Sequence, residues 1–121
     1  MDDYAQLHPG AFAARTPDRP AVIMAGSGRV ITFAGFEALS NQCAHLLRSL
    51  GLVRGDRVSI LMENHPLYLP LAWGGMRAGL RVTAISTHLG SAEVDYILTD
   101  NDSQALLASH AMAATAGALE A

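Results

Sequence analysis

Three side chains with chemically active groups follow one another at residues 86–88. Ser86 and Thr87 carry hydroxyl groups, and His88 carries an imidazole that titrates near neutral pH. They stand at the end of RVTAIS, a run that predicts a strand over 81–86. Ligands of open α/β sheets bind beyond the carboxyl ends of the strands, so these residues are a candidate ligand contact. Because serine and threonine also close turns, a turn without a ligand is the alternative.

The other candidates for chemistry lack the partners that a site needs. Five histidines show no i, i+4 pair and no nearby cysteine or carboxylate at a metal-ligand spacing: His8, His45, His65, His88 and His110. Gly26-Ser27-Gly28 lacks the further glycine, the lysine and the helix of a phosphate loop, so it predicts a hairpin turn. Asp100 and Asp102 flank Asn101, which predicts a solvated turn more than an acid–base pair. We therefore predict no catalytic, cofactor-binding or metal-binding residue in this chain.

Three further side chains are assigned to packing. Trp73 and Met76 lie three residues apart, on one face of a predicted helix, and such pairs are usually core contacts. Cys43 is the single cysteine, so it cannot form a disulfide within the chain, and it falls on the apolar face of another predicted helix. We expect all three to be buried.

The charges exclude some classes of partner. The 121 residues carry a formal net charge of −3, and every basic residue is an arginine: Arg15, Arg19, Arg29, Arg48, Arg54, Arg57, Arg77 and Arg81. These arginines are scattered singly, which argues against nucleic-acid binding and against a polybasic membrane patch. No apolar run approaches the roughly 20 residues of a membrane span, and the acidic start MDDYAQLHPG differs from a signal peptide. The sequence therefore predicts a cytoplasmic protein.

The elements that position the candidate residues alternate between strands and helices. AVIMAGSGRVITF predicts a β-hairpin, and the helix that follows has Thr32 as N-cap and Gly51 just past its end. Further along, the pattern predicts strand 57–62, helix 66–78, strand 81–86, helix 91–99 and strand 105–109. Strands covered on both faces and joined by helices pair in parallel through right-handed crossovers. We expect one parallel sheet with helices on both faces, plus the hairpin.

Local signals mark the ends of the predicted helices. Gly79 is expected to end helix 66–78, and Arg77 in its last turn complements the helix dipole. Pro70 and the pair Gly74-Gly75 weaken that helix. Ser91 is expected to cap helix 91–99, and the alanine-rich segment 109–121 is expected to begin a further helix.

Several segments in this order resemble a known superfamily. They are TPDRPAVIM, ITFAGFEALSNQCAHLLRSLGLVRGDRVSILMENHP and MRAGLRVTAISTHLGSAEVDYILTDNDSQALLAS. Over roughly residues 8–110 they resemble the N-terminal part of the adenylate-forming enzymes, which include acyl-CoA synthetases, peptide-synthetase adenylation domains and luciferases. ITFAGFEAL is similar to the first core motif of that superfamily and MRAGLRVTAIS to the second. ENHPLYLPLAWGGMRAGLRVTAISTHL looks most like bacterial acyl-CoA synthetases for fatty or other bulky carboxylic acids.

The resemblance implies which reaction the full-length enzymes catalyse, and it also shows which of their motifs this chain lacks. Such enzymes use ATP and Mg²⁺ to convert a carboxylic acid to an acyl-adenylate, and then transfer the acyl group to coenzyme A. They use a Ser/Thr/Gly-rich loop ending in Pro-Lys-Gly, an acidic residue that binds the ribose and a lysine in a C-terminal lid. The chain contains none of these motifs, so residues 1–121 are expected to be a partial N-terminal subdomain that is inactive alone.

Two other classes of function stay open. One is a free-standing, non-catalytic α/β module for binding or interaction. The other is a small Rossmann-like nucleotide binder, although ILMENHP is not the glycine-rich loop that this would need. A subdomain cut from a larger core would also expose apolar surface and strand edges, so we expect a homo-oligomer that buries at least about 1,000 Å².

The chain departs from the superfamily pattern at four positions. Ala84 and Thr87 stand where many relatives have proline, which suggests a subgroup. Gly35 stands where a helix-favouring acidic residue is common, and Pro70 interrupts a helix that is smoother in relatives. The last two are expected to cost stability.

Overall fold

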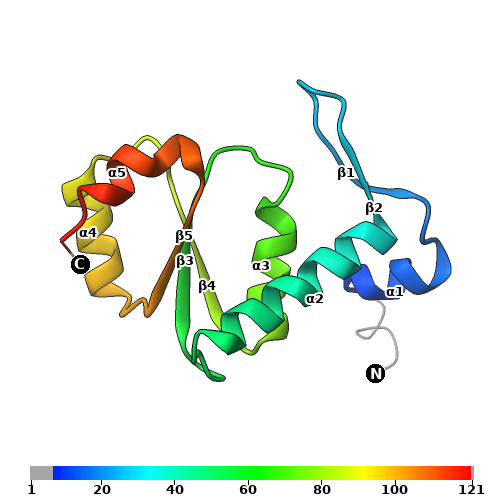
Figure 1. The fold of residues 1–121 in the computed structure, drawn as a ribbon, viewed down its shortest axis with the longest axis horizontal. Coiled ribbons are helices and arrows are strands. Elements are labelled where there is room, and N and C mark those ends of the chain that lie inside the picture. Colours follow the sequence, from blue (N-terminus) through cyan, green and yellow to red (C-terminus); the bar gives the residue numbers. More distant parts are fainter. Residues whose placement is uncertain (1–6, 121) are drawn as a thin grey trace.

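The computed structural model describes residues 7–120, and its order of elements confirms the predicted alternation of strands and helices (Figure 1). The elements are α1 (Pro9–Arg15), β1 (Pro20–Ile23), β2 (Val30–Thr32), α2 (Phe33–Ser49), β3 (Arg57–Leu61), α3 (Tyr68–Arg77), β4 (Arg81–Ile85), α4 (Ser91–Asp100), β5 (Ala105–Ala108), the 3₁₀ helix η2 (His110–Met112) and α5 (Ala113–Gly117). The helix expected in segment 109–121 is therefore present but short.

Three strands form the parallel sheet that the sequence predicts. The strand order is β4-β3-β5, so β3 is central and both other strands have one open edge. The register is unbroken from Arg57 opposite Arg81 to Leu61 opposite Ile85, and from Val58 opposite Ala105 to Leu61 opposite Ala108. The strand after the first crossover thus lies on one side of β3, and the strand after the second lies on the other.

Helices cover both faces of this sheet, as expected (Figure 1). One face carries α2 and α3, where Leu47 is fully buried and packs in a cluster with Val58 of β3. The other face carries α4 and the C-terminal helices, where Val94 and Leu98 pack against Leu61 and Ile85. Burial of two apolar faces by helices is what holds a parallel sheet together.

The predicted hairpin is present and forms a sheet of its own. β1 and β2 pair antiparallel, with a register shift between Pro20 and Val22. The turn includes Gly28, whose φ of +73° is accessible to glycine at little cost, and whose amide donates to Met24 O at 2.8 Å. The hairpin projects from the end of the molecule that carries α1 (Figure 1).

Caps explain where α2 and α4 begin, and one expected cap is wrong. The hydroxyl of Thr32 accepts the Gly35 amide at 3.1 Å, and Gly51 follows the helix with φ of +91°, both as predicted. The N-cap of α4 is Gly90, because Ser91 already has helical backbone geometry. Its hydroxyl instead donates to Thr115 O of α5 at 3.4 Å, which joins the two helices.

The expected weak points of α3 are compatible with a stable helix. Because α3 begins at Tyr68, two residues later than predicted, Pro70 lies in its first turn, where an amide has no acceptor within the helix. Gly74 allows α2 and α3 to touch: an added Cβ would lie 2.5 Å from Cys43 Cβ and 2.8 Å from Ser40 O. Cys43 is buried as predicted, and this burial raises the pKa of its thiol.

Gly35→Glu is expected to raise the free energy of unfolding by about 0.5–1.5 kcal/mol. A Cβ at Gly35 would meet Thr32 Oγ1 at 3.4 Å and Ile31 Cγ2 at 3.5 Å, which are ordinary contacts. The new carboxylate can accept the Thr32 amide and complete a capping box. Urea unfolding measures the gain, and Gly35→Ala separates backbone entropy from capping. A Glu variant less stable than the Ala variant would contradict the capping box.

Candidate functional site

The carboxyl end of the sheet has the topology at which α/β proteins bind ligands. The chain leaves β3 toward the face that carries α3, whereas it leaves β5 toward the opposite face through η2 and α5 (Figure 1). Because β3 and β5 are neighbours, the two departing loops separate at this point, which is where ligands of open α/β sheets usually bind. This position in the sheet is the candidate site.

Two side chains meet at this position, one from each strand end. Glu63 comes two residues after β3, and Ser109 comes directly after β5. The buried Ser109 hydroxyl donates to Glu63 Oε2, and the Ser109 amide donates to Leu61 O at 3.3 Å. The hydrogen bond from Ser109, aided by the amide of Glu63 itself, lowers the pKa of Glu63. The site therefore presents an ionised carboxylate that can accept a hydrogen bond or attract a cation.

Sequence reasoning missed Glu63 and Ser109. Ser86 was selected because polar residues at the carboxyl ends of strands often face ligands. The same rule applies to the ends of β3 and β5. What the sequence lacked was the strand order, which places β5 next to β3 and makes β4 an edge strand.

Ser109→Ala is expected to raise the pKa of Glu63 toward its ordinary value. In the wild type the folded-state pKa is lowered, so the hydrogen bond favours the folded state at neutral pH and loses this effect as pH falls through that pKa. The measurement is NMR titration of the Glu63 carboxyl carbon. Ser109→Thr keeps a hydroxyl and should keep the lowered pKa. An unchanged pKa in Ser109→Ala would show that the hydroxyl is not the cause.

Ser86, Thr87 and His88 lie in a turn at the end of β4. The Ser86 hydroxyl accepts the His88 amide at 3.2 Å, and both side chains are exposed. Among the described residues, no hydrogen bond joins these three to Glu63 or Ser109. The geometry shows the turn role, and a ligand contact of these residues in a larger protein stays a prediction.

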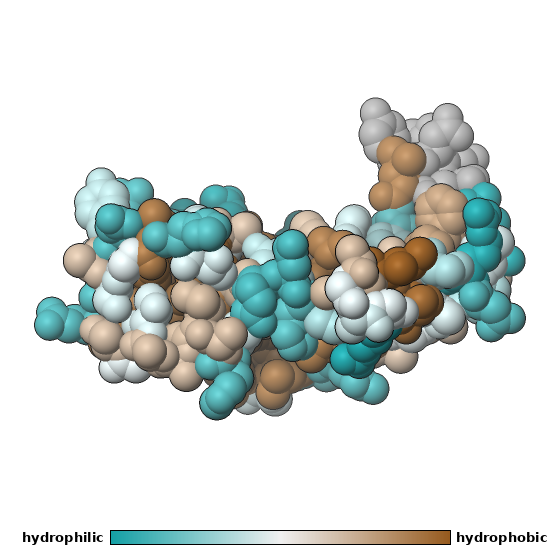
Figure 2. Space-filling view, turned by 90° about the horizontal axis from the view of Figure 1, so that it is seen from above, coloured by the Kyte–Doolittle hydropathy of each residue, from teal (hydrophilic) through white to brown (hydrophobic). Residues whose placement is uncertain are grey.

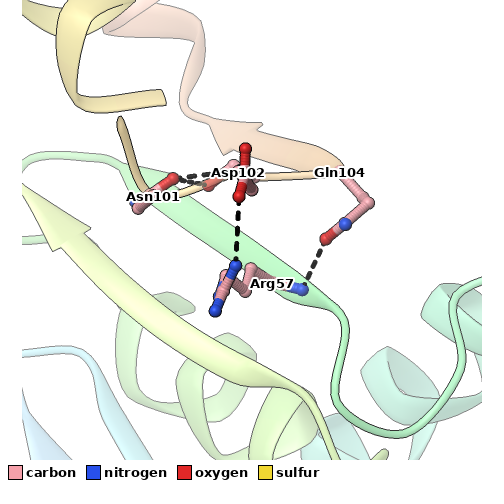
Figure 3. A network of polar contacts seen from close by, with 5 residues as sticks. Arg57, Asn101, Asp102 and Gln104 are labelled. Atoms are coloured by element: carbon pink, nitrogen blue, oxygen red, sulfur yellow. Dashed lines mark hydrogen bonds and ion pairs between the residues drawn. The ribbon is translucent and has the colours of Figure 1, made fainter. Parts of the chain in front are cut away.

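The predicted turn around Asp100 and Asp102 is present and carries a network (Figure 3). Asp102 has φ of +53°, and its carboxylate lies 3.5 Å from the Arg57 guanidinium. Beneath it, Asn101 accepts the amide and hydroxyl of Ser103 and donates to the buried Ser59 hydroxyl at 3.3 Å. The two serine hydroxyls are 2.5 Å apart. The contacts join the α4–β5 turn to β3, so this cluster has a structural role.

The prediction that Trp73 and Met76 are core residues is wrong. Met76 is 46% exposed and Trp73 half-buried, and both line a surface hollow of about 470 Å³ beside α2. Helical periodicity places them on one side of α3, but α2 covers the neighbouring side.

Arg77 spans this hollow to donate to Glu37 at 2.5 Å and Asn41 at 2.8 Å. It therefore joins the two helices, a role that its position near the helix end did not reveal.

The ion pair in this hollow is satisfied within the protein. The hydrogen bond from Arg77 lowers the pKa of Glu37, and the same bond raises the pKa of Arg77. Both groups therefore stay charged at neutral pH and are directed at each other.

A second hollow lies between the hairpin and the start of α3. It has a volume of about 460 Å³ and is lined by Val22, Ile23, Met24, Ala25, Asn64, His65, Pro66, Tyr68 and Leu69. Hydrophobic side chains gather on the half of the molecule that carries the hairpin (Figure 2). Ile23 is 65% exposed and Leu69 is 50% exposed. This apolar groove is suited to contact with another apolar surface.

Two kinds of site considered from the sequence can be checked in the described residues, a metal cluster and a phosphate loop at 26–28. No group of three or more His, Cys, Asp or Glu side chains within residues 7–120 could hold a metal ion. Gly26-Ser27-Gly28 joins two strands and does not open a helix, so its amides lack the geometry of a phosphate loop. Among these residues, no helix is long and apolar enough to cross a membrane.

Comparisons with known proteins agree on one family. Residues 11–121 match the sequence model of a family described as AMP-binding enzyme. Long-chain-fatty-acid–CoA ligase FadD13 of Mycobacterium tuberculosis is 38% identical over 77 residues, which are 64% of this chain and 15% of that protein. The 3-hydroxybenzoate–CoA ligase of Aromatoleum sp. is 31% identical over 84 residues, which are 69% of this chain and 16% of that protein. The chain thus spans about 15% of the length of the curated relatives it matches.

The fold of the chain is also similar to that of a solved structure. The crystal structure of the N-terminal domain of FACL13 from Mycobacterium tuberculosis superposes with a TM-score of 0.87 and 31% sequence identity. The match covers 93% of this chain and 29% of that one. The similarity therefore extends over nearly all of the α/β arrangement described above.

Proposed function

The chain belongs to the AMP-binding enzyme family, and we propose that it supplies the N-terminal α/β part of an ATP-dependent acyl-CoA ligase. In the proposed reaction, a fatty or other bulky carboxylic acid is activated to an acyl-adenylate, and the acyl group then passes to the thiol of coenzyme A. The observation that carries the proposal is the match of 93% of the chain to the N-terminal domain of FACL13. Two relatives that are CoA ligases, one for long-chain fatty acids and one for 3-hydroxybenzoate, support the substrate class.

In this proposal residues 1–121 are a partial subdomain that is inactive alone. Transfer of the adenylyl group of ATP, with release of pyrophosphate, depends mainly on positive groups that stabilise charge on the phosphates, and the chain has no lysine. Two of its arginines, Arg57 and Arg77, already pair with carboxylates of the same chain. ATP, Mg²⁺ and coenzyme A would therefore be bound mainly by other parts of the enzyme, in the cytoplasm where these compounds are available.

A free-standing, non-catalytic interaction module is the second candidate. The apolar groove between the hairpin and α3 favours it, because exposed apolar side chains are suited to a protein contact. A module of this kind would use the family fold without its chemistry.

Two measurements test the proposal. The purified chain should show no ATP–pyrophosphate exchange with fatty or aromatic acids, above a heat-treated control. A chimera in which residues 11–121 replace the matching segment of FadD13 should form acyl-CoA, whereas FadD13 lacking that segment should not. Exchange by the chain alone would refute its inactivity. A chimera that folds, as judged by circular dichroism, but forms no acyl-CoA would favour the non-catalytic module.

A further inference from the structure

The loop between β3 and α3 contains a histidine whose ring accepts a hydrogen bond from the backbone. Nδ1 of His65 accepts the amide of Leu67 at 3.0 Å, and both residues are half-buried. Leu67 is the N-cap of α3, and the amides at the start of a helix have no acceptor within the helix. The imidazole supplies such an acceptor, so it holds the loop in the conformation from which α3 begins.

This hydrogen bond requires the neutral form of the ring. A neutral imidazole that accepts at Nδ1 carries its proton on Nε2. Protonation places a hydrogen on Nδ1 as well, so that two donors, Nδ1–H of His65 and N–H of Leu67, would face each other. Histidine side chains change their charge between about pH 5 and 8. Mild acidification is therefore expected to break the contact between His65 and Leu67.

The charged ring has a different partner in the same loop, the carboxylate of Glu63. The hydrogen bond from Ser109 lowers the pKa of Glu63, and attraction to a protonated His65 lowers it further. Glu63 is thus ionised at the pH at which the ring gains its proton. Among the described residues that line the hollow beside His65, Tyr68 is the other titratable one, and a phenol is uncharged in this pH range. Residues 22–25 of the hairpin, which line the same hollow, are all apolar.

We propose that His65 is a pH-sensitive switch, whose ring exchanges the Leu67 amide for the Glu63 carboxylate when it is protonated. The neutral ring fixes the start of α3, whereas the charged ring turns toward the carboxyl end of β3. His65 also lines the apolar groove between the hairpin and α3, so protonation adds a positive charge to the wall of this groove. Because a charge is costly to bury, the groove becomes less suited to an apolar contact in acid. The inference concerns contacts within one loop and does not depend on the proposed function.

The first test needs no substitution. In NMR spectra of the 121-residue chain with isotope-labelled histidine, the ring nitrogen shifts distinguish the two neutral tautomers from the imidazolium. At about pH 8 the ring of His65 should carry its proton on Nε2. As the pH falls to about 5, the amide shift of Leu67 should change with the same midpoint as the ring nitrogens of His65. A neutral ring with its proton on Nδ1 would overturn the proposal, as would a Leu67 amide that does not follow the ring.

Two substitutions separate the switch from other effects of acid. His65→Asn keeps an acceptor that does not titrate, because an asparagine side chain can accept the amide two residues on. Its Leu67 amide should stay bonded over the whole pH range. His65→Ala removes the acceptor, so the Leu67 amide should exchange with water about fivefold faster than in the wild type at about pH 8. If the Leu67 amide of His65→Asn responded to pH as in the wild type, the proposal would fail, since another group would be titrating.

Glu63→Gln tests the second contact of the switch. Glutamine can still accept the hydroxyl of Ser109, but it has no charge to attract the protonated ring. The ring of His65 should then take up its proton at a lower pH than in the wild type. An unchanged midpoint would show that Glu63 is not the partner of the charged ring, and the proposed exchange of partners would be wrong.

Discussion

Gly74→Ala should lower the free energy of unfolding by about 1–3 kcal/mol, even though alanine is the better helix former. The added methyl group would lie 2.5 Å from Cys43 Cβ and 2.8 Å from the backbone oxygen of Ser40. A backbone atom cannot rotate away, so α2 and α3 must separate. Their separation would loosen the core around Leu47 and the Arg77–Glu37 contact together. Urea unfolding followed by circular dichroism measures the loss.

Gly35→Ala is the matched control for this prediction, since it makes the same substitution in a helix. A Cβ at Gly35 would make only ordinary van der Waals contacts, so alanine there should raise the free energy of unfolding by about 0.5–1 kcal/mol. The two substitutions should therefore have opposite signs. If Gly74→Ala also stabilised the protein, the close approach of α2 and α3 would be wrong.

Asn101→Ala should lower the free energy of unfolding by about 2–3 kcal/mol. The substitution removes one bond to the hydroxyl of Ser59, which is fully buried. It also removes the two bonds that Asn101 accepts from Ser103 (Figure 3). The Ser59 and Ser103 hydroxyls keep each other as partners, so the expected loss is that of three hydrogen bonds at about 1 kcal/mol each. The same urea experiment measures the effect.

Asp102→Asn is the control in the neighbouring residue. It removes the charge that faces Arg57 but keeps a side chain that tolerates a positive φ. The carboxylate is 76% exposed, and exposed ion pairs contribute little, so the change should stay within about 0.5 kcal/mol. If both variants lowered the free energy of unfolding equally, the network would act through charge more than through its buried hydrogen bonds.

Local signals allowed most of the fold to be predicted. The cap at Thr32, the glycine at 51 and the apolar strand runs act over a few residues, and a single sequence displays them. Right-handed crossovers are a general rule, so parallel pairing followed from the alternation of elements. The start of α3 was placed two residues early, and this small error made Pro70 look disruptive.

Contacts between distant segments could not be predicted in the same way. Glu63 and Ser109 are 46 residues apart, and Glu37 and Arg77 are 40 residues apart. Hydrophobic periodicity indicates which residues of a helix share a face, but it does not indicate which element packs against that face. The prediction for Trp73 and Met76 failed for this reason, and the candidate site was first sought at the end of β4 instead of between β3 and β5.

The strand order also has a consequence for synthesis on the ribosome. β3 is made first among the three parallel strands, yet it is the central one and needs both later strands as neighbours. Translation proceeds at about 5–20 residues per second, so β3 remains incompletely paired until β5 has left the ribosome. The period during which a nascent chain can misassemble is therefore set by how quickly α3, β4 and α4 are translated.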